Sequence, residues 1–454
     1  MHQTQPRSTA AAREPVSAAP KPAVSMVDAI ALTIGIVIGA GIFRTPSLVA
    51  ANASSESIVL LAWVVGGLIS FAGALVYAEL ASTFPHPGGD YHFLTRAFGR
   101  RLSFLFAWAR ISVIQTGSIT FLSFVFGDYA STLFPLGEFS SAIYAALIIV
   151  VLTIINILGV RQGTGVQSAL TAIEVLGVLL IIAAGMIAPA AAPAAATAST
   201  PASSSFGFMM VLILLTYGGW NEAAYVSAEL RDVKRNMVKT LLFSLLVITT
   251  LYVLINWAYL RALGLDGAAK SMQVAADVMR LAFGETGAKL IGTLVAISAL
   301  TSANASIFTG ARTSYALGRD FAPFAFLGRW SGANGTPVHA LLLQAGVSLT
   351  LVLFGALTRE GLGAMVDYTA PVFWFFFLLT GISLFVLRRK EPHQERPFRA
   401  PLFPVVPLLF CTASAYLLYS SLNYAGKGTI AGIAVLAAGA LMLPFVNRQS
   451  DRSS

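Results

Sequence analysis

The stretches GIVIGAGIFRTP, at 35–46, and LLTYGGWN, at 214–221, each place glycines in the middle of a long apolar run. A glycine there marks either close packing between helices or a break in the helix. Gly35 and Gly39 have the spacing of a packing pair, but the adjacent Gly218 and Gly219 do not. We therefore expect two discontinuous helices, broken at 38–42 and at 216–220.

The composition is that of a membrane protein. Hydrophobic residues make up 56% of the 454 positions and charged residues 11%, against about 25% charged in ordinary globular chains. About twelve apolar runs are long enough to cross a bilayer, which takes roughly 20 residues each. An apolar run in lipid must satisfy its own backbone, and the alternation of a β-barrel is absent, so we expect an all-α polytopic membrane protein. The expected spans are 26–50, 58–83, 101–134, 139–159, 165–188, 206–228, 238–260, 286–317, 338–357, 363–387, 404–424 and 428–446.

The two interrupted spans lie five spans apart, which is typical of an inverted repeat. This predicts a first repeat at 26–188 and a second at 205–388, with two further spans in 389–446. Residues 1–25 and 447–454 are expected as cytoplasmic tails, the first of them disordered. The low-complexity stretch 189–204 is expected as a mobile periplasmic linker.

Charge predicts the orientation. Most of the 29 Lys and Arg residues fall on one side of the expected map, which places both termini in the cytoplasm and the chain in the plasma (inner) membrane. The net charge of +9 then reflects orientation and not nucleic-acid binding. The five histidines lie in tails, loops or span ends, and Cys411 is the single cysteine. We therefore expect no metal, cofactor or disulfide.

Longer motifs resemble the amino acid, polyamine and organocation (APC) superfamily, and within it the L-amino acid transporter-like permeases. They are IGAGIF with Pro46, AELASTFPHPGGDYHFL at 78–94, TYGGWNEAAYVSAELRDVKRN at 216–236 and TSANASIFTGARTSYALGRD at 301–320. The resemblance covers nearly the whole chain. It implies five helices repeated upside down, with helices 1 and 6 unwound, and an amino acid as substrate.

The resemblance also implies how the substrate is held. The α-carboxylate would bind the backbone N–H groups of Gly39, Ala40 and Gly41, where the second half-helix begins and carries the positive end of its dipole. The ammonium group would bind carbonyls at the ends of the preceding half-helices, near Val37, Ile38, Leu215, Thr216 and Gly218. Ile42 and Gly219 complete the two breaks. Tyr217 and Trp220 either gate the site or pack in the core, and Asn221 is expected to tie the second break together.

Charged residues inside the membrane are costly, so each needs a reason. Glu174 stands where many relatives carry a lysine thought to replace a sodium ion. It could take up a proton, bind a cation together with Ser302, or be structurally paired. Arg110 is expected to pair with an acid, with Glu174 and Glu79 as candidates.

Two further polar residues are expected near the site. For Glu222 the alternatives are contact with a cationic substrate or a proton, and a gate-side hydrogen bond. Asn304, in the same stretch as Ser302, is expected in a supporting role.

These features favour a secondary transporter of amino acids, with neutral L-amino acids expected, working by alternating access with protons or by exchange. A polyamine or cationic amino acid antiporter is the alternative within transport, and a non-transporting nutrient sensor the alternative of another class. No nucleophile, base and metal ligands converge as an enzyme would need. The expected partners are the amino acid, a possible proton and membrane lipids, with no obligatory protein partner.

Overall fold

The computed structural model describes residues 24–86, 88–158, 164–191, 204–227, 230–329, 336–358, 361–424 and 426–450, and these fold as helices joined by short connections. In chain order the helices are α1 Met26–Val37, α2 Gly41–Ala51, α3 Glu56–Thr83, α4 Asp90–Phe98, α5 Arg100–Ala109, η1 Arg110–Ile114, α6 Gln115–Leu133, α7 Ser140–Ile157, α8 Thr164–Ile187, α9 Ser204–Tyr217, η2 Trp220–Val226, α10 Val233–Lys270, α11 Val274–Asp320, η3 Ala322–Phe324, α12 Val338–Thr358, α13 Gly361–Lys390, α14 Val405–Asn423 and α15 Lys427–Ser450. η1 is a π-helix, and η2 and η3 are 3-10 helices.

The expected all-α polytopic membrane fold is confirmed. Within the described ranges, 10 helices are long and apolar enough to cross a membrane, or up to 11 if the bent pair α1 and α2 is one span. The span expected at 206–228 is filled by the 14-residue α9 followed by η2, so no single long helix occupies it. The twelve expected runs thus appear, but two of them as broken pieces.

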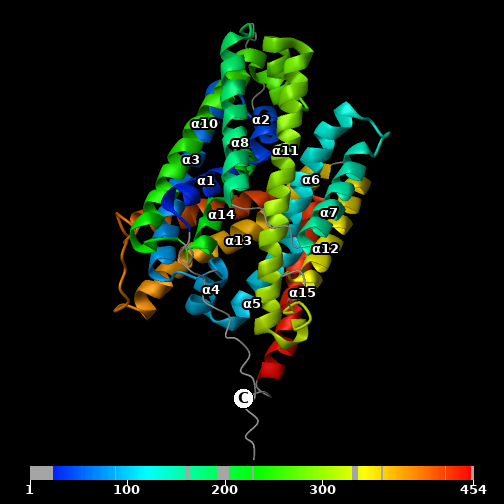
Figure 1. The fold of residues 1–454 in the computed structure, drawn as a ribbon. Helices are drawn as coiled ribbons and strands as arrows, with labels where there is room; N and C mark the ends of the chain where they lie inside the picture. The colour runs from blue at the N-terminus through cyan, green and yellow to red at the C-terminus, as the bar shows by residue number, and fades with distance from the viewer. Residues whose placement is uncertain are drawn as a thin grey trace, which may run out of the picture.

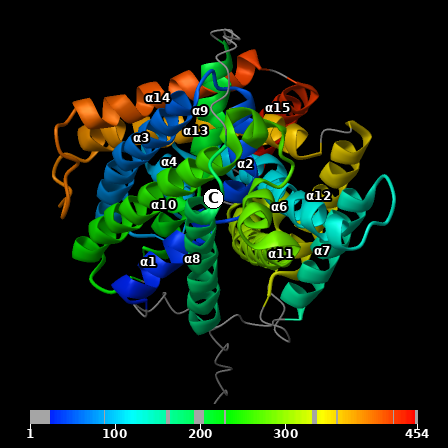
Figure 2. The same ribbon diagram turned by 90° about the horizontal axis from the view of Figure 1, so that it is seen from above.

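The helices form a bundle with distinct ends. In Figure 1, α4 lies at one end and α2 toward the other. Seen along the bundle in Figure 2, α2, α6 and α11 lie near the middle, whereas α7, α12 and α14 lie at the rim. Leu147, Leu353 and Leu409 on these rim helices are more than half exposed, which suits a surface that faces lipid.

The link between α10 and α11 differs from the expected map. Residues 261–285 lie between the expected spans 238–260 and 286–317, yet α10 continues to Lys270 and α11 already begins at Val274. Gly264 and Gly284 interrupt the two helices with φ of 68° and 66°. Glycine tolerates this left-handed region because it has no Cβ. The two helices are thus prolonged beyond their apolar parts and then bent.

At both ends, the described residues extend into the predicted tails. Val24 and Ser25, which sequence analysis assigned to the disordered tail, form a β-bridge to Leu230 and the N-cap of α1. α15 continues to Ser450, past the predicted start of the C-terminal tail at 447. Residues 1–23 and 451–454 of the predicted tails, and 192–203 of the predicted linker, lie outside the described residues.

Candidate functional site

The first break lies between α1 and α2, whose axes differ by 45°. The N–H of Ile38 closes the last turn of α1 on the Ile34 carbonyl at 2.7 Å, and Ile38 itself leaves the helix with ψ of 55°. The N–H groups of Gly39, Ala40 and Gly41 then donate to no atom of the described chain. These are the free donors that begin α2, and such groups attract an anion.

The second break lies between α9 and η2. Gly218 donates to the Leu215 carbonyl at 3.0 Å, and Gly219 adopts a φ of 110°. The N–H of Gly219 donates to Asn221 Oδ1 at 3.3 Å, which is the tie expected for Asn221. A side chain on Gly219 would lie 2.8 Å from Ile36 Cγ2, so glycine also permits the close approach of α1.

A cavity of about 230 Å³ borders both breaks and reaches α6 and α11. Most of the predicted site residues line it: Val37, Gly39, Gly41, Arg110, Leu215, Thr216, Gly218, Gly219, Asn221, Glu222 and Ser302. The predicted residues outside its lining are Ile38, Ala40, Ile42, Glu174, Tyr217, Trp220 and Asn304. The structure therefore brings the two predicted breaks together around one space.

Tyr217 and Trp220 pack in the core. The hydroxyl of Tyr217 donates to the Trp63 carbonyl at 3.0 Å. The ring of Trp220 meets Tyr77 edge-on at 5.1 Å between centroids and Phe377 at 5.5 Å. Of the two roles considered for these aromatic residues, this conformation shows packing.

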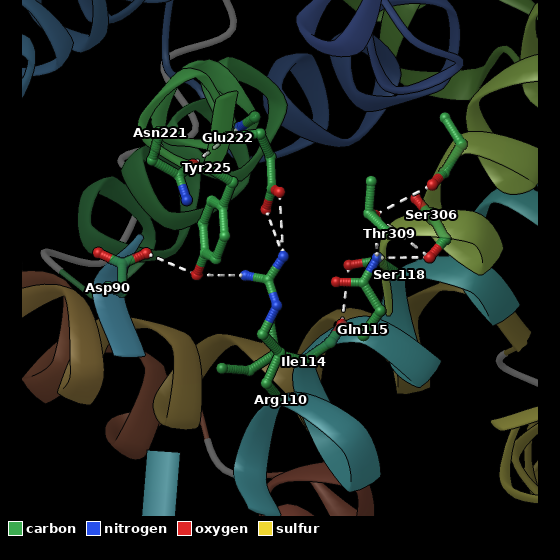
Figure 3. Close-up of polar contacts among 12 residues, drawn as sticks. Asp90, Arg110, Ile114, Gln115, Ser118, Asn221, Glu222, Tyr225, Ser306 and Thr309 are labelled. Atoms are coloured by element: carbon green, nitrogen blue, oxygen red, sulfur yellow. Dashed lines mark hydrogen bonds and ion pairs between the residues drawn. The ribbon is translucent and has the colours of Figure 1, made fainter. Parts of the chain in front are cut away.

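Arg110 enters the site from the π-helix η1, a wide turn that often occurs at functional positions. Its Nη2 donates to both oxygens of Glu222, at 2.9 and 3.0 Å, and its Nη1 to the Tyr225 hydroxyl at 3.0 Å. Tyr225 in turn donates to Asp90 Oδ2 at 3.0 Å, so a polar chain leads from the cavity to α4 (Figure 3).

This arrangement corrects the expected partner of Arg110. Glu174 and Glu79 were the candidates, but the partner is Glu222. Glu79 accepts two bonds from the guanidinium of Arg388, at 2.8 and 2.5 Å, and one from the N–H of Ala400 at 2.7 Å. Glu222, for which contact with a cationic substrate or a proton and a gate-side hydrogen bond were the alternatives, is therefore the acid that neutralises the buried arginine.

Glu174 is buried on α8 and accepts a bond from Ser298 Oγ at 2.9 Å. Its other oxygen has no partner within the described residues. Ser302, one turn further along α11, faces the break instead, because a methyl group on Gly39 would lie 3.1 Å from its Oγ. Asn304 Oδ1 accepts from Asn156 at 2.7 Å and so ties α11 to α7.

Sequence reasoning missed Tyr252. Its hydroxyl donates to the Val37 carbonyl at 2.6 Å, and the Thr216 carbonyl lies 3.2 Å from the same oxygen. This hydroxyl therefore lies between the carbonyl ends of both broken helices and donates its one hydrogen to the nearer of them, Val37. A tyrosine in an apolar span is expected to have a hydrogen-bond partner for its hydroxyl, but the sequence does not indicate which group that partner is.

It also missed a polar wall formed by Gln115 and Ser118 of α6 and Ser306 and Thr309 of α11, which line the cavity (Figure 3). Ser, Thr and Gln are common in membrane helices, where they bond to neighbouring backbone. A single sequence gives no signal that distinguishes the polar side chains that face a cavity from those that only bond to neighbouring backbone.

The described residues contain no group of three or more His, Cys, Asp or Glu that could hold a metal ion.

Comparison with known proteins gives a consistent result. A family model described as "Amino acid permease" matches residues 24–443. The b(0,+)-type amino acid transporter 1 of Rattus norvegicus is 28% identical over 431 residues, covering 92% of this chain and 84% of the relative. The large neutral amino acids transporter small subunit 2 of Homo sapiens is 31% identical over 423 residues, covering 88% and 76%. A serine/threonine exchanger of Bacillus subtilis is 26% identical over 405 residues, covering 88% and 91%.

Proposed function

Because the chain belongs to the amino acid permease family, we propose that it is a secondary active transporter that moves neutral L-amino acids across the plasma membrane by alternating access. The observation that carries this proposal is the break at Gly39–Gly41, whose free N–H groups border a cavity of about 230 Å³ in the middle of the bundle. A cavity between half-helices is where transporters of this kind bind their substrates.

The breaks suit a zwitterion. The N–H groups of Gly39, Ala40 and Gly41 would hold the α-carboxylate with the positive dipole end of α2. The carbonyls of Val37, Ile38, Leu215, Thr216 and Gly218 would hold the ammonium group. The Val37 and Leu215 carbonyls already accept one bond each, from Tyr252 and Gly218, and a carbonyl oxygen has two lone pairs. Backbone alone can thus satisfy both charges.

The charges of the cavity favour a neutral side chain. Among the lining residues, Arg110 and Glu222 are the charged ones, and they pair with each other. Glu222 alone would have favoured a polyamine or cationic amino acid, the alternative substrates. Paired, it leaves no net charge to offset the desolvation of a cationic side chain.

We propose Glu174 as the coupling residue for protons. It is buried, away from the cavity, and its one described bond comes from a serine hydroxyl and not from a cation. Burial in a medium of low dielectric favours the neutral form of a carboxyl group. Replacing Glu174 with Gln should abolish the dependence of uptake on an imposed pH gradient. Unchanged dependence would remove Glu174 from the coupling mechanism.

The proposal includes the predicted topology. The repeats at 26–188 and 205–388 would form the two inverted halves, with both termini in the cytoplasm and α4 at the cytoplasmic end. The expectation of no obligatory protein partner stays a prediction, since one relative is named a small subunit.

The test is flux through the purified protein in proteoliposomes. Labelled serine should enter by a saturable route, and putrescine and arginine should not compete. Uptake that requires an amino acid inside the vesicle would identify an exchanger. Saturable flux of the amines alone would establish the cationic alternative, and binding without flux would establish a sensor.

A further inference from the structure

Polar side chains gather on one wall of the cavity, where α6 faces α11. Gln115 Nε2 donates to the Ser306 carbonyl at 2.8 Å and lies 3.4 Å from Thr309 Oγ1 (Figure 3). A backbone carbonyl can only accept, so these contacts fix which end of the amide faces α11. The side chain of Gln115 is therefore held in one orientation.

That orientation leaves the amide oxygen available. No described group donates to Gln115 Oε1, and Gln115 lines the cavity. Ser306 Oγ likewise has no described partner and is not among the fully enclosed atoms that lack one. The wall thus offers a fixed acceptor and an adaptable hydroxyl to whatever occupies the cavity.

The wall lies within reach of a short side chain. Ser302, Ser306 and Thr309 are spaced i, i+4 and i+7 on α11, which places them on one face of the helix. Ser302 borders the break at Gly39. At about 1.5 Å per residue, Ser306 lies about 6 Å and Thr309 about 10 Å further along the axis. An amino acid held by its backbone at the break therefore reaches this wall with a few side-chain atoms.

We propose that the transporter selects amino acids with short uncharged side chains that carry a hydroxyl or carboxamide group, and that Gln115 determines this specificity. The inference rests on the proposed function. A substrate hydroxyl or amide N–H would donate to Gln115 Oε1, whereas a methyl group in its place would leave that buried acceptor without a partner. A charged side chain would meet the Arg110–Glu222 pair, whose charges cancel, so no opposite net charge would offset its desolvation.

Threonine and valine test the proposal, because they differ by a hydroxyl in place of a methyl group. Each is used unlabelled to compete with labelled serine uptake in proteoliposomes. Threonine should compete about tenfold better than valine. Replacing Gln115 with Met should bring the ratio close to one, mainly by weakening threonine.

Gln344→Met is the matched control. Gln344 is also a buried glutamine whose Nε2 donates to a carbonyl of α11, that of Ile307 at 3.0 Å, but it does not line the cavity. This variant should keep the native preference for threonine. If Gln115→Met folds poorly, the ratio of competition by threonine to competition by valine is compared between the native protein and Ser306→Ala instead.

Equal competition by threonine and valine in the native protein would overturn the inference, as would a Gln115→Met variant that weakens both alike. Native protein that carries no amino acid at all would instead refute the proposed function.

Discussion

Replacing Arg110 with Met should destabilise the protein strongly, because Glu222 would be left without its cation. Arg110 is 4% exposed and makes three hydrogen bonds to Glu222 and Tyr225 at 2.9 to 3.0 Å. Removing one partner of a buried ion pair costs about 3 to 5 kcal/mol. Glu222 is 20% exposed to the cavity, so we expect the lower end, about 3 kcal/mol.

The double variant Arg110→Met with Glu222→Gln separates the pair from the individual side chains. It removes both charges, so it should be less destabilised than the sum of the two single variants by about 2 kcal/mol. Denaturation in detergent micelles, followed by tryptophan fluorescence, measures the three free energies of unfolding. Arg280→Met is the control, because Arg280 pairs with Asp277 and Glu285 but is 44% exposed. It should change stability by less than about 1 kcal/mol.

The single variant Arg110→Met also tests whether the Arg110–Glu222 pair keeps the cavity neutral. An unpaired Glu222 would give the cavity a net negative charge, so lysine should begin to compete with serine for uptake in Arg110→Met. Strictly additive single variants, together with unchanged exclusion of lysine, would refute the reasoning that the pair is coupled and keeps the cavity neutral.

Three further predictions concern other parts of the structure. Tyr252→Phe removes the hydroxyl that donates to the Val37 carbonyl. It should raise the KM for amino acids about fivefold, as expected for the loss of about 1 kcal/mol. Tyr259→Phe should leave the KM unchanged, because the Tyr259 hydroxyl has no partner among the described residues. Gly219→Ala adds backbone strain of about 1 to 3 kcal/mol and a clash with Ile36, so it should abolish uptake; Gly99→Ala, at φ of 89° in open space, should be destabilised but active. Burial, with the neighbouring His86 and Arg96, lowers the pKa of His92 to about 4. Between about pH 4 and 6.5 the unfolded chain therefore binds a proton that the folded chain does not, so the free energy of unfolding should fall as the pH drops through this range. His92→Gln should flatten this part of the dependence of the melting temperature on pH. An unchanged profile of melting temperature against pH would contradict this role of His92.

The sequence predicted the parts that depend on local chemistry. Runs of apolar residues locate the spans, and the paired glycines at 218 and 219 locate a break because few other residues tolerate a φ of 110°. Asn221 was predicted as a tie for the same local reason.

Parts that depend on contacts between distant helices were not predictable. The partner of Arg110 follows from the π-helix at 110–114, which no sequence signal announces, and from the placement of η2 beside it. Tyr252 and Gln115 reach the site through the packing of α10 against α1 and of α6 against α11. In the sequence, neither Tyr252 nor Gln115 can be distinguished from a residue that packs against a neighbouring helix or faces lipid.

The central claim is that the two breaks recognise both charges of a zwitterion through backbone groups. The most direct measurement is competition with labelled serine uptake by ethanolamine, which lacks the carboxylate, and by 3-hydroxypropanoate, which lacks the ammonium group. Both should fail to compete at concentrations where unlabelled serine competes fully. Competition by ethanolamine equal to that of serine would show that the N–H groups at Gly39–Gly41 do not hold a carboxylate, and would contradict the account.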